Sequence, residues 1–196
     1  MKRIVLLMIA AVSLAVPSSL LAQSELNHFE VGAFADYFNL SRTTPHINFV
    51  GLGARVAVNV QQNVQLEAEM AYDFNRSFAS DFTDNTGSVQ LVRTKLRPLH
   101  AMFGPKFQTS GPFRLFATGK VGFVNFSTSN QNASSGFQGA LGSVTTGNTR
   151  FALYPGAGVE GFWGPIGVRL EAGDEIYFDN GSRNNLKVTF GPQFRF

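Results

Sequence analysis

The sequence predicts an all-β protein, an eight-stranded antiparallel up-and-down transmembrane β-barrel. Apolar and polar residues alternate in eight segments, which is typical of strands because successive side chains point to opposite faces. Short and long connections alternate between these segments. The last ten residues, KVTFGPQFRF, form a strand whose aromatic face runs to Phe196. Such a strand needs a pairing partner and a lipid cover, and a closed barrel in a membrane supplies both.

The N-terminal segment has the features of a secretory signal peptide. A basic start with Lys2 and Arg3 precedes an apolar run, and the segment ends on the small residue Ala22. An uncleaved membrane anchor is the alternative, and it is disfavoured because the apolar run is short and is followed by Pro17. We therefore expect a signal peptide at residues 1–22 and a single β-barrel domain at residues 23–196.

The composition of the expected mature chain excludes several classes of protein. Two of the 16 basic residues lie in the signal peptide, which leaves 14 against 13 acidic residues, so the charge gives no reason to expect nucleic-acid binding. There is no cysteine, so disulfides cannot stabilise the exported domain. The mean hydropathy is only +0.01 although there are 20 phenylalanines, because the apolar residues alternate with polar ones.

Each alternating segment is near the roughly 9–11 residues that a tilted strand needs to cross a bilayer. In chain order, the eight segments are residues 28–38, 48–60, 64–74, 98–107, 113–126, 151–161, 166–178 and 187–196.

Within every segment one side is apolar and the other carries charged or polar groups. The first three segments and the fourth alternate clearly, whereas the fifth alternates more weakly, with Lys120 opposite Val121 and Phe123. A soluble barrel is the structural competitor, but it would place its apolar side inside and its charges outside. The charges on the side opposite the lipid-type residues are Glu30, Asp36, Arg55, Glu67, Glu69, His100, Lys106, Lys120, Glu160, Arg169, Glu171, Lys187 and Arg195.

The connections indicate how the strands are oriented. The short ones are residues 61–63, 108–112 and 163–165, and the long ones are residues 41–47, about 79–97, 127–149 and 179–185. Strict alternation is expected when all short turns lie on one side of a membrane and all long loops lie on the other. An even number of strands also places both termini on the side of the short turns.

With these features the sequence resembles the small eight-stranded outer membrane barrels related to the membrane domain of outer membrane protein A, also described as the outer membrane protein beta-barrel domain. The resemblance covers residues 28–196 and includes their terminal assembly signal, here Thr189, Gly191, Phe194 and Phe196. It implies a porin-like, integral protein of the Gram-negative cell envelope, with periplasmic termini and extracellular long loops. It also implies that the barrel assembly machinery binds the last strand during insertion.

Prolines within the expected strands depart from an ideal ladder. Pro105, Pro155 and Pro192 each lack an N–H group, so we expect bulges or ends of pairing there, and a bulge at Pro98 would invert the faces above it. Full-length relatives of outer membrane protein A often add a peptidoglycan-binding domain after the barrel. None follows Phe196, so we do not expect a tethering role.

The inward charges give two functional hypotheses. An eight-stranded barrel is just wide enough to be filled by its own side chains, and buried charges must be paired. A structural or surface-interaction barrel with a lumen plugged by salt bridges is therefore favoured, and a small pore or transport barrel is the alternative. The expected lumen charge network comprises Glu30, Arg55, Glu67, Glu69, Lys106, Lys120, Glu160, Arg169, Glu171, Lys187 and Arg195.

No motif predicts catalysis, a cofactor or a metal site. The histidines do not form a cluster with metal-ligand spacing, and the sequence has no GxSxG motif or phosphate loop. Some small barrels modify lipid A with a histidine and serine or acidic partners, so a weaker alternative combines His46 with Ser77, Asp81 or Ser182. We predict that the protein is not an enzyme.

The expected partners are outer membrane lipids and lipopolysaccharide, in addition to the assembly machinery. Arg93, Lys95 and Arg97 share the outward parity of Leu99, so they would rise from the lipid-facing band of the fourth strand. At that height they would meet lipid phosphates, which arginine binds in a bidentate manner. The alternative is a solvated loop whose charges face water. The sequence does not indicate an oligomeric state.

Aromatic residues are expected at the two membrane interfaces, which is where their rings are enriched in barrels. The set expected at the short-turn end is Phe107, Phe113, Phe162, Trp163, Phe194 and Phe196, and the set expected at the long-loop end is Tyr37, Tyr72, Phe74, Phe123 and Phe178.

Overall fold

The computed structural model describes residues 29–41, 47–83, 89–131, 148–178 and 181–196, which lie almost entirely in strands. The described strands are β1 Phe29–Leu40, β2 Ile47–Gln61, β3 Val64–Asp73, β4 Arg76–Thr83, β5 Val89–Gln108, β6 Phe113–Gln131, β7 Asn148–Trp163, β8 Ile166–Asp174, β9 Ile176–Phe178, β10 Ser182–Arg183 and β11 Leu186–Arg195. Among the described residues, no helix is long and apolar enough to cross a membrane. The expected signal peptide lies outside the described residues.

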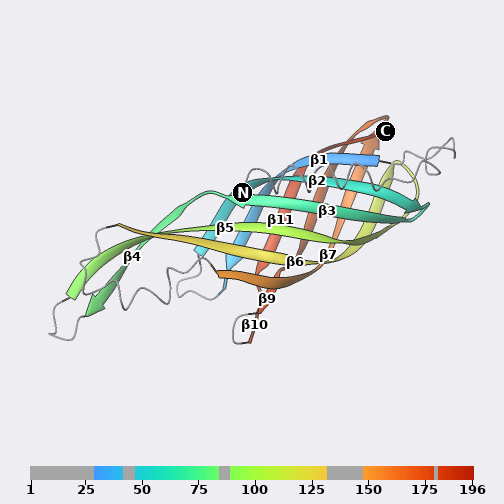
Figure 1. Ribbon diagram of the computed structural model, residues 1–196. Coiled ribbons are helices and arrows are strands. Elements are labelled where there is room, and N and C mark those ends of the chain that lie inside the picture. The colour runs from blue at the N-terminus through green and yellow to red at the C-terminus, as the bar shows by residue number, and fades with distance from the viewer. Residues whose placement is uncertain (1–28, 42–46, 84–88, 132–147, 179–180) are drawn as a thin grey trace, which may run out of the picture.

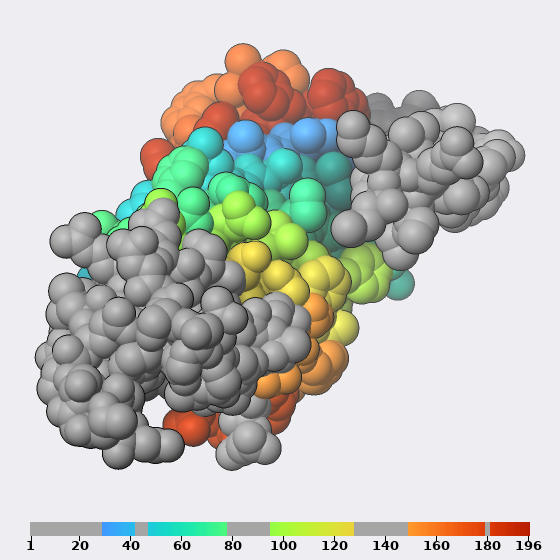
Figure 2. Space-filling view, turned by 60° about the vertical axis from the view of Figure 1, so that its left-hand side comes forward, coloured from blue at the N-terminus to red at the C-terminus, as the bar shows by residue number. Residues whose placement is uncertain are grey.

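Eight of these strands close into an antiparallel barrel in the order β1, β2, β3, β5, β6, β7, β8 and β11. The last strand returns to the first, and Figure 2 shows red β11 beside blue β1 at this closure. The terminal residue takes part, because the Phe196 N–H donates to the Phe29 carbonyl at 2.9 Å. The predicted fold class is therefore confirmed, and no edge strand remains in the barrel wall.

Short and long connections lie at opposite ends of the barrel. In Figure 1 the C-terminus lies at the same end as the tight turns that follow β2, β5 and β7, and the β4–β5 hairpin projects from the other end. The turn after β7 contains Gly164 with φ at +66°, a conformation that glycine adopts without steric cost. These two ends are called the short-turn end and the long-loop end below.

The prediction of a loop at about residues 79–97 is wrong. β4 pairs with the first part of β5, so a two-stranded hairpin extends above the barrel wall. β6 likewise continues to Gln131, inside the loop expected at residues 127–149. These extensions are held by backbone hydrogen bonds, and apolar residues such as Phe78, Leu91 and Val92 do not keep the regular alternation that marks the barrel strands.

Three prolines, Pro105, Pro155 and Pro192, each interrupt the pairing with one neighbouring strand without ending their own strand. Pairing of β5 with β6 pauses between Phe103 and Lys106, around Pro105, and resumes in the same register. A similar pause lies beside Pro155, where the pairing of β7 passes from β8 to β9. Another lies beside Pro192, between β1 and β11.

Pro98 differs because it lies at the point where β5 changes its pairing partner from β4 to β3. The pairing Tyr72↔Leu99 gives way to Arg76↔Leu96, which is a shift of one residue on the β3–β4 side. β5 itself remains continuous, so Leu96 is buried, whereas Arg97 stays on the outward side with Leu99. The faces are therefore not inverted along β5.

Apolar side chains face outward from all eight barrel strands. Leu52 is 60% exposed and Phe190 is 57% exposed, whereas Glu67 and Lys106 are fully buried inside. This distribution is the reverse of a soluble barrel, in which the apolar face would fill the interior. Among the expected interfacial aromatics Phe162 is misplaced, because its ring is buried in the lumen beneath the guanidinium groups of Arg114 and Arg195.

The interior is apolar toward the long-loop end. Phe38, Phe49 and Tyr177 are almost fully buried there and belong to one cluster, which we call the apolar cap. Its members are Phe38, Leu40, Phe49, Leu96, Met102, Val124, Ala152, Tyr154 and Tyr177. The remaining interior, below the apolar cap, is lined mainly by buried charged and polar side chains, together with the rings of Phe34, Phe116 and Phe162.

Candidate functional site

A buried group of carboxylates and cations occupies the middle of the lumen. The Lys120 ammonium lies 2.6 Å from Glu67 Oε1, 2.6 Å from Glu69 Oε2 and 2.9 Å from Glu171 Oε1. These side chains come from β6, β3 and β8, and they meet because inward positions recur at every second residue of each strand. One ammonium thus bridges strands that are not neighbours in the barrel wall.

Two guanidinium groups complete this central group. Arg169 lies 2.5 Å from Glu67 and 2.5 Å from Glu171, and Arg55 lies 2.9 Å from Glu69 and 3.1 Å from Glu171. Three cations therefore face three carboxylates, which neutralises the group without solvent. The planar guanidinium groups also stack on interior rings, Arg169 on Phe116 and Arg55 on Phe34.

A second group lies nearer the short-turn end. Lys106 Nζ is 2.9 Å from Glu160 Oε2 and 3.7 Å from Glu30 Oε2, while Arg114 is 3.3 Å from Glu30 and 3.5 Å from Glu160. Gln193 donates a further hydrogen bond to Glu160 at 3.1 Å. Sequence reasoning missed Arg114, although its position between outward Phe113 and outward Leu115 shows that it points inward.

A third group lies beneath the apolar cap, and we call it the upper cluster: Asp36, Asp73, His100, Glu175 and Lys187. His100 Nδ1 is 2.6 Å from Glu175 Oε1, and His100 Nε2 is 3.1 Å from Asp73 Oδ2. Lys187 Nζ lies 3.4 Å from Glu175 Oε2, 3.8 Å from Asp36 Oδ2 and 3.5 Å from Glu69 Oε1. The upper cluster is therefore joined to the central group through Lys187.

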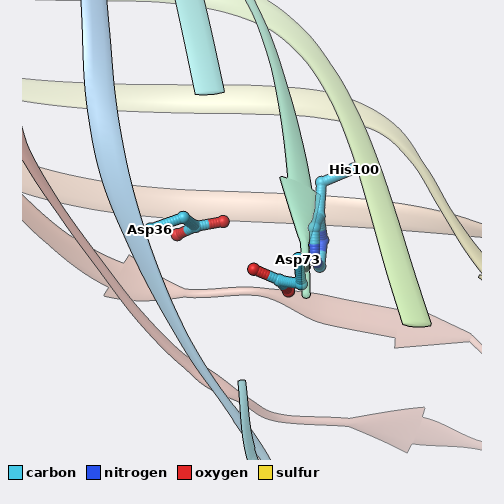
Figure 3. A group of neighbouring side chains, drawn as sticks. All are labelled: Asp36, Asp73 and His100. Atoms are coloured by element: carbon cyan, nitrogen blue, oxygen red, sulfur yellow. Dashed lines mark hydrogen bonds and ion pairs between the residues drawn. The ribbon is translucent and has the colours of Figure 1, made fainter. Parts of the chain in front are cut away.

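Asp36, Asp73 and His100 form a candidate metal-ligand set within the upper cluster. Figure 3 shows the carboxylates of Asp36 and Asp73 turned toward one another, with the His100 ring beside Asp73. One ligand atom from each residue lies within 4.8 Å of the others. The sequence did not indicate this set because its members come from β1, β3 and β5 and have no motif spacing.

Ten of the eleven residues expected in the lumen network form ion pairs in these three groups. The ten are Glu30, Arg55, Glu67, Glu69, Lys106, Lys120, Glu160, Arg169, Glu171 and Lys187. Arg195 lies apart, at the rim, where it donates to the Gly164 carbonyl at 2.9 Å and covers the Phe162 ring.

The residues of the expected assembly signal occupy both faces of β11. Thr189 points inward and accepts a hydrogen bond from Arg55 at 3.3 Å, while Phe194 and Phe196 face outward. Gly191 lies against β1, and an added Cβ there would approach the Ala33 carbonyl oxygen to 2.0 Å. Glycine is therefore required at this position for the two strands to approach each other.

The other candidate residues from the sequence are placed as follows. Arg97 donates to the Tyr72 hydroxyl at 2.8 Å on the outer face, Lys95 is half-buried, and the side chain of Arg93 lies outside the described part of the structure. Ser77 lies on β4 and Ser182 on β10, which extend from different barrel strands. His46 and the side chain of Asp81 also fall outside the described residues.

Comparisons with solved structures show small outer membrane barrels of the same fold. The N-terminal β-barrel domain of Pseudomonas aeruginosa OprF has a TM-score of 0.56 at 13% identity, covering 87% of this chain and 98% of that chain. Neisserial surface protein A gives 0.55 at 12% identity, covering 86% and 97%. Ail, the attachment invasion locus protein of Yersinia pestis, gives 0.52 at 14% identity, also covering 86% and 97%. At these identities the likeness shows the fold alone.

Sequence comparison gives the family. A search among proteins of curated function finds no match. Residues 5–194 match the outer membrane protein beta-barrel domain family, which is nearly the whole chain. The closed eight-stranded wall, its apolar outer face and its charged interior are the features that such a family requires. The chain therefore belongs to the outer membrane protein beta-barrel domain family and is an integral protein of the bacterial outer membrane.

Proposed function

We propose that this protein is a non-conducting outer membrane barrel with a structural and surface-interaction role, whose lumen is closed by its own side chains. The observation that carries the proposal is the buried position of Lys120 among three carboxylates at 2.6–2.9 Å. An ammonium held this closely leaves no room for a hydrated ion to pass beside it. In this role the protein is not an enzyme.

Two further features support a closed lumen. The ion pairs are arranged so that acids and bases balance in the middle of the barrel, which removes the field that would draw ions in. Above them, the apolar cap fills the lumen toward the long-loop end with rings such as Phe38 and Tyr177. Hydrophobic constrictions of this kind exclude water and ions.

The two ends of the barrel lie on opposite sides of the membrane. The short-turn end, with the C-terminus, faces the periplasm, and the long-loop end, with the β4–β5 hairpin, faces the exterior. The surface-interaction role then belongs to the hairpins at the long-loop end, since binding residues are commonly placed on loops that a rigid scaffold supports.

Planar-bilayer recording of the refolded protein tests closure. We expect no steady single-channel steps from barrels whose insertion is verified by heat-modifiable migration. A Phe38→Ala, Tyr177→Ala variant separates the two barriers, because it removes large rings from the apolar cap and leaves the ion pairs in place. We expect this variant to remain non-conducting as well, since the ion pairs still block the lumen. Steady ion-sized steps from the full chain, seen again in a variant that lacks residues 132–147, would show a pore instead.

We also propose that the outer face of β5 contacts lipopolysaccharide phosphates. Arg97 lies outward over the Tyr72 ring, at 4.9 Å from its centroid, on the lipid-facing side of the wall near the long-loop end. A guanidinium in this position can donate to a phosphate while the ring anchors its stem at the interface. Arg93 and Lys95 lie on the same strand and share its parity.

Replacing Arg93, Lys95 and Arg97 with glutamine is expected to weaken binding of purified barrel to lipid A roughly tenfold, because three exposed ion pairs at about 0.5 kcal/mol each amount to roughly 1.5 kcal/mol. The difference should shrink as salt is added. Binding is measured in detergent by titration calorimetry, with Arg195→Gln, a cation removed at the short-turn end, as control. Equal affinity of the triple variant and the native barrel would disprove the contact.

A further inference from the structure

We propose that Asp36, Asp73 and His100 form a binding site for a first-row divalent cation, of which Zn²⁺ is the best fit, inside the barrel beneath the apolar cap. The site lies outside the central ion-pair group and does not depend on the proposed surface role. Its ligands are one imidazole nitrogen and two carboxylates, a set that suits Zn²⁺ and its neighbours better than Ca²⁺ or Mg²⁺.

The geometry is close to that of a formed site. Ligand atoms around tetrahedral zinc lie about 3.3 Å apart when the bonds are about 2.0–2.1 Å. His100 Nε2 and Asp73 Oδ2 are already 3.1 Å apart. Asp36 lies opposite them, and the three ligand atoms fall within 4.8 Å of one another, so the Asp36 carboxylate would move closer to the other two when the ion binds.

The carboxylates aimed at this site have unused hydrogen-bonding capacity. Asp36 is 1% exposed, and neither of its carboxylate oxygens has a hydrogen-bond partner among the described residues. The Asp73 Oδ1 atom is also buried and without such a partner. Lys187 is the cation nearest to Asp36, at 3.8 Å, which is too long for a hydrogen bond. Buried carboxylates in this state are strongly destabilising unless a cation or a proton satisfies them.

The upper cluster has fewer positive than negative charges, unlike the other two groups in the lumen. The central and short-turn groups contain five carboxylates, on Glu30, Glu67, Glu69, Glu160 and Glu171, and five cations, on Arg55, Lys106, Arg114, Lys120 and Arg169. The upper cluster has three carboxylates and one permanent cation, Lys187. With a neutral His100 it carries two uncompensated negative charges, which a single divalent cation neutralises.

Glu175 positions the histidine as a ligand. Its Oε1 lies 2.6 Å from His100 Nδ1, so it accepts the proton on that nitrogen and leaves Nε2 directed at Asp73. A carboxylate behind a metal-bound histidine fixes the tautomer and raises the basicity of the ligand nitrogen. When Nε2 binds the metal, the proton on Nδ1 keeps its hydrogen bond to Glu175.

The surroundings select against strongly hydrated ions. The Phe38 ring packs edge-on against His100, with 4.7 Å between the ring centroids, and the apolar cap covers the site on the long-loop side. Mg²⁺ usually keeps several of its waters, for which a dry interior offers no partners. Because the site is enclosed, we expect the cation to enter while the barrel folds.

The experiment is to refold the barrel from urea in metal-free buffer with a small excess of Zn²⁺, remove free metal by gel filtration and measure bound zinc by atomic emission. We expect one zinc per folded barrel. Asp36→Asn and His100→Gln should each lose bound zinc at least tenfold, and Glu175→Gln should lower the affinity about 10–100-fold through the histidine. Glu30→Gln, a buried lumen carboxylate outside the upper cluster, is the matched control and should retain zinc.

A second measurement reports on the ligand itself. In ¹⁵N NMR spectra of the imidazole, zinc should shift His100 Nε2 and leave Nδ1 protonated. Absence of zinc from the folded native barrel, or retention of it by folded His100→Gln, overturns the proposal. Equal loss in Glu30→Gln also overturns it, because the effect would not be specific to the upper cluster. If Asp36→Asn does not fold, His100→Gln and Asp73→Asn decide the outcome.

Discussion

Replacing Phe194 and Phe196 with serine is expected to abolish assembly of the barrel in the outer membrane. Both side chains face outward at the closure of the wall, and each apolar ring of this size contributes about 1.5–3 kcal/mol when it is removed from water. The backbone hydrogen bonds between residue 196 and Phe29 are kept in this variant, so the loss is that of the two rings. Unfolded precursor should accumulate in the periplasm, as measured by fractionation and heat-modifiable gel migration.

The matched control changes Phe113 and Leu115 to serine. These residues are as exposed on the outer face of β6, near the short-turn end, but they lie outside the terminal strand. If the barrel assembly machinery binds the last strand, this control should assemble far better than the terminal variant. Equal amounts of protease-resistant barrel from the terminal variant and the native chain would contradict the prediction.

Lys120→Met is expected to destabilise the barrel by about 3–5 kcal/mol, because it leaves uncompensated charge among three buried carboxylates. Lys120 is the only side chain in the central group that lies within 3 Å of Glu67, Glu69 and Glu171 together in the described structure. The free energy of unfolding is measured by urea titration of the protein refolded into lipid vesicles.

Two comparisons show whether charge is the cause. Adding Glu171→Gln to Lys120→Met should restore part of the lost stability, since one carboxylate is then neutral. Arg114→Gln removes a cation that is partly exposed near the rim and should cost much less. A Lys120→Met barrel as stable as the native protein would mean that the central ion pairs contribute little net stability.

The sequence by itself determined the barrel wall. Alternation with a period of two placed Leu52 and Phe190 outward and Glu67 and Lys106 inward, because a strand has only two faces. The same alternation at the last residues indicated closure onto the first strand. It did not reveal the β4–β5 hairpin, where backbone pairing continues although the apolar residues no longer keep a regular period of two.

Which inward groups meet was decided only by the tertiary structure. Lys120 could have reached many carboxylates of the lumen, and the stagger of the closed strands selects Glu67, Glu69 and Glu171. The same stagger brings Asp36 and His100 to one height beneath the apolar cap, although 64 positions separate them in the chain. Periodicity fixes the face of a side chain, whereas its height and its partner across the lumen depend on the tilt and register of the whole barrel.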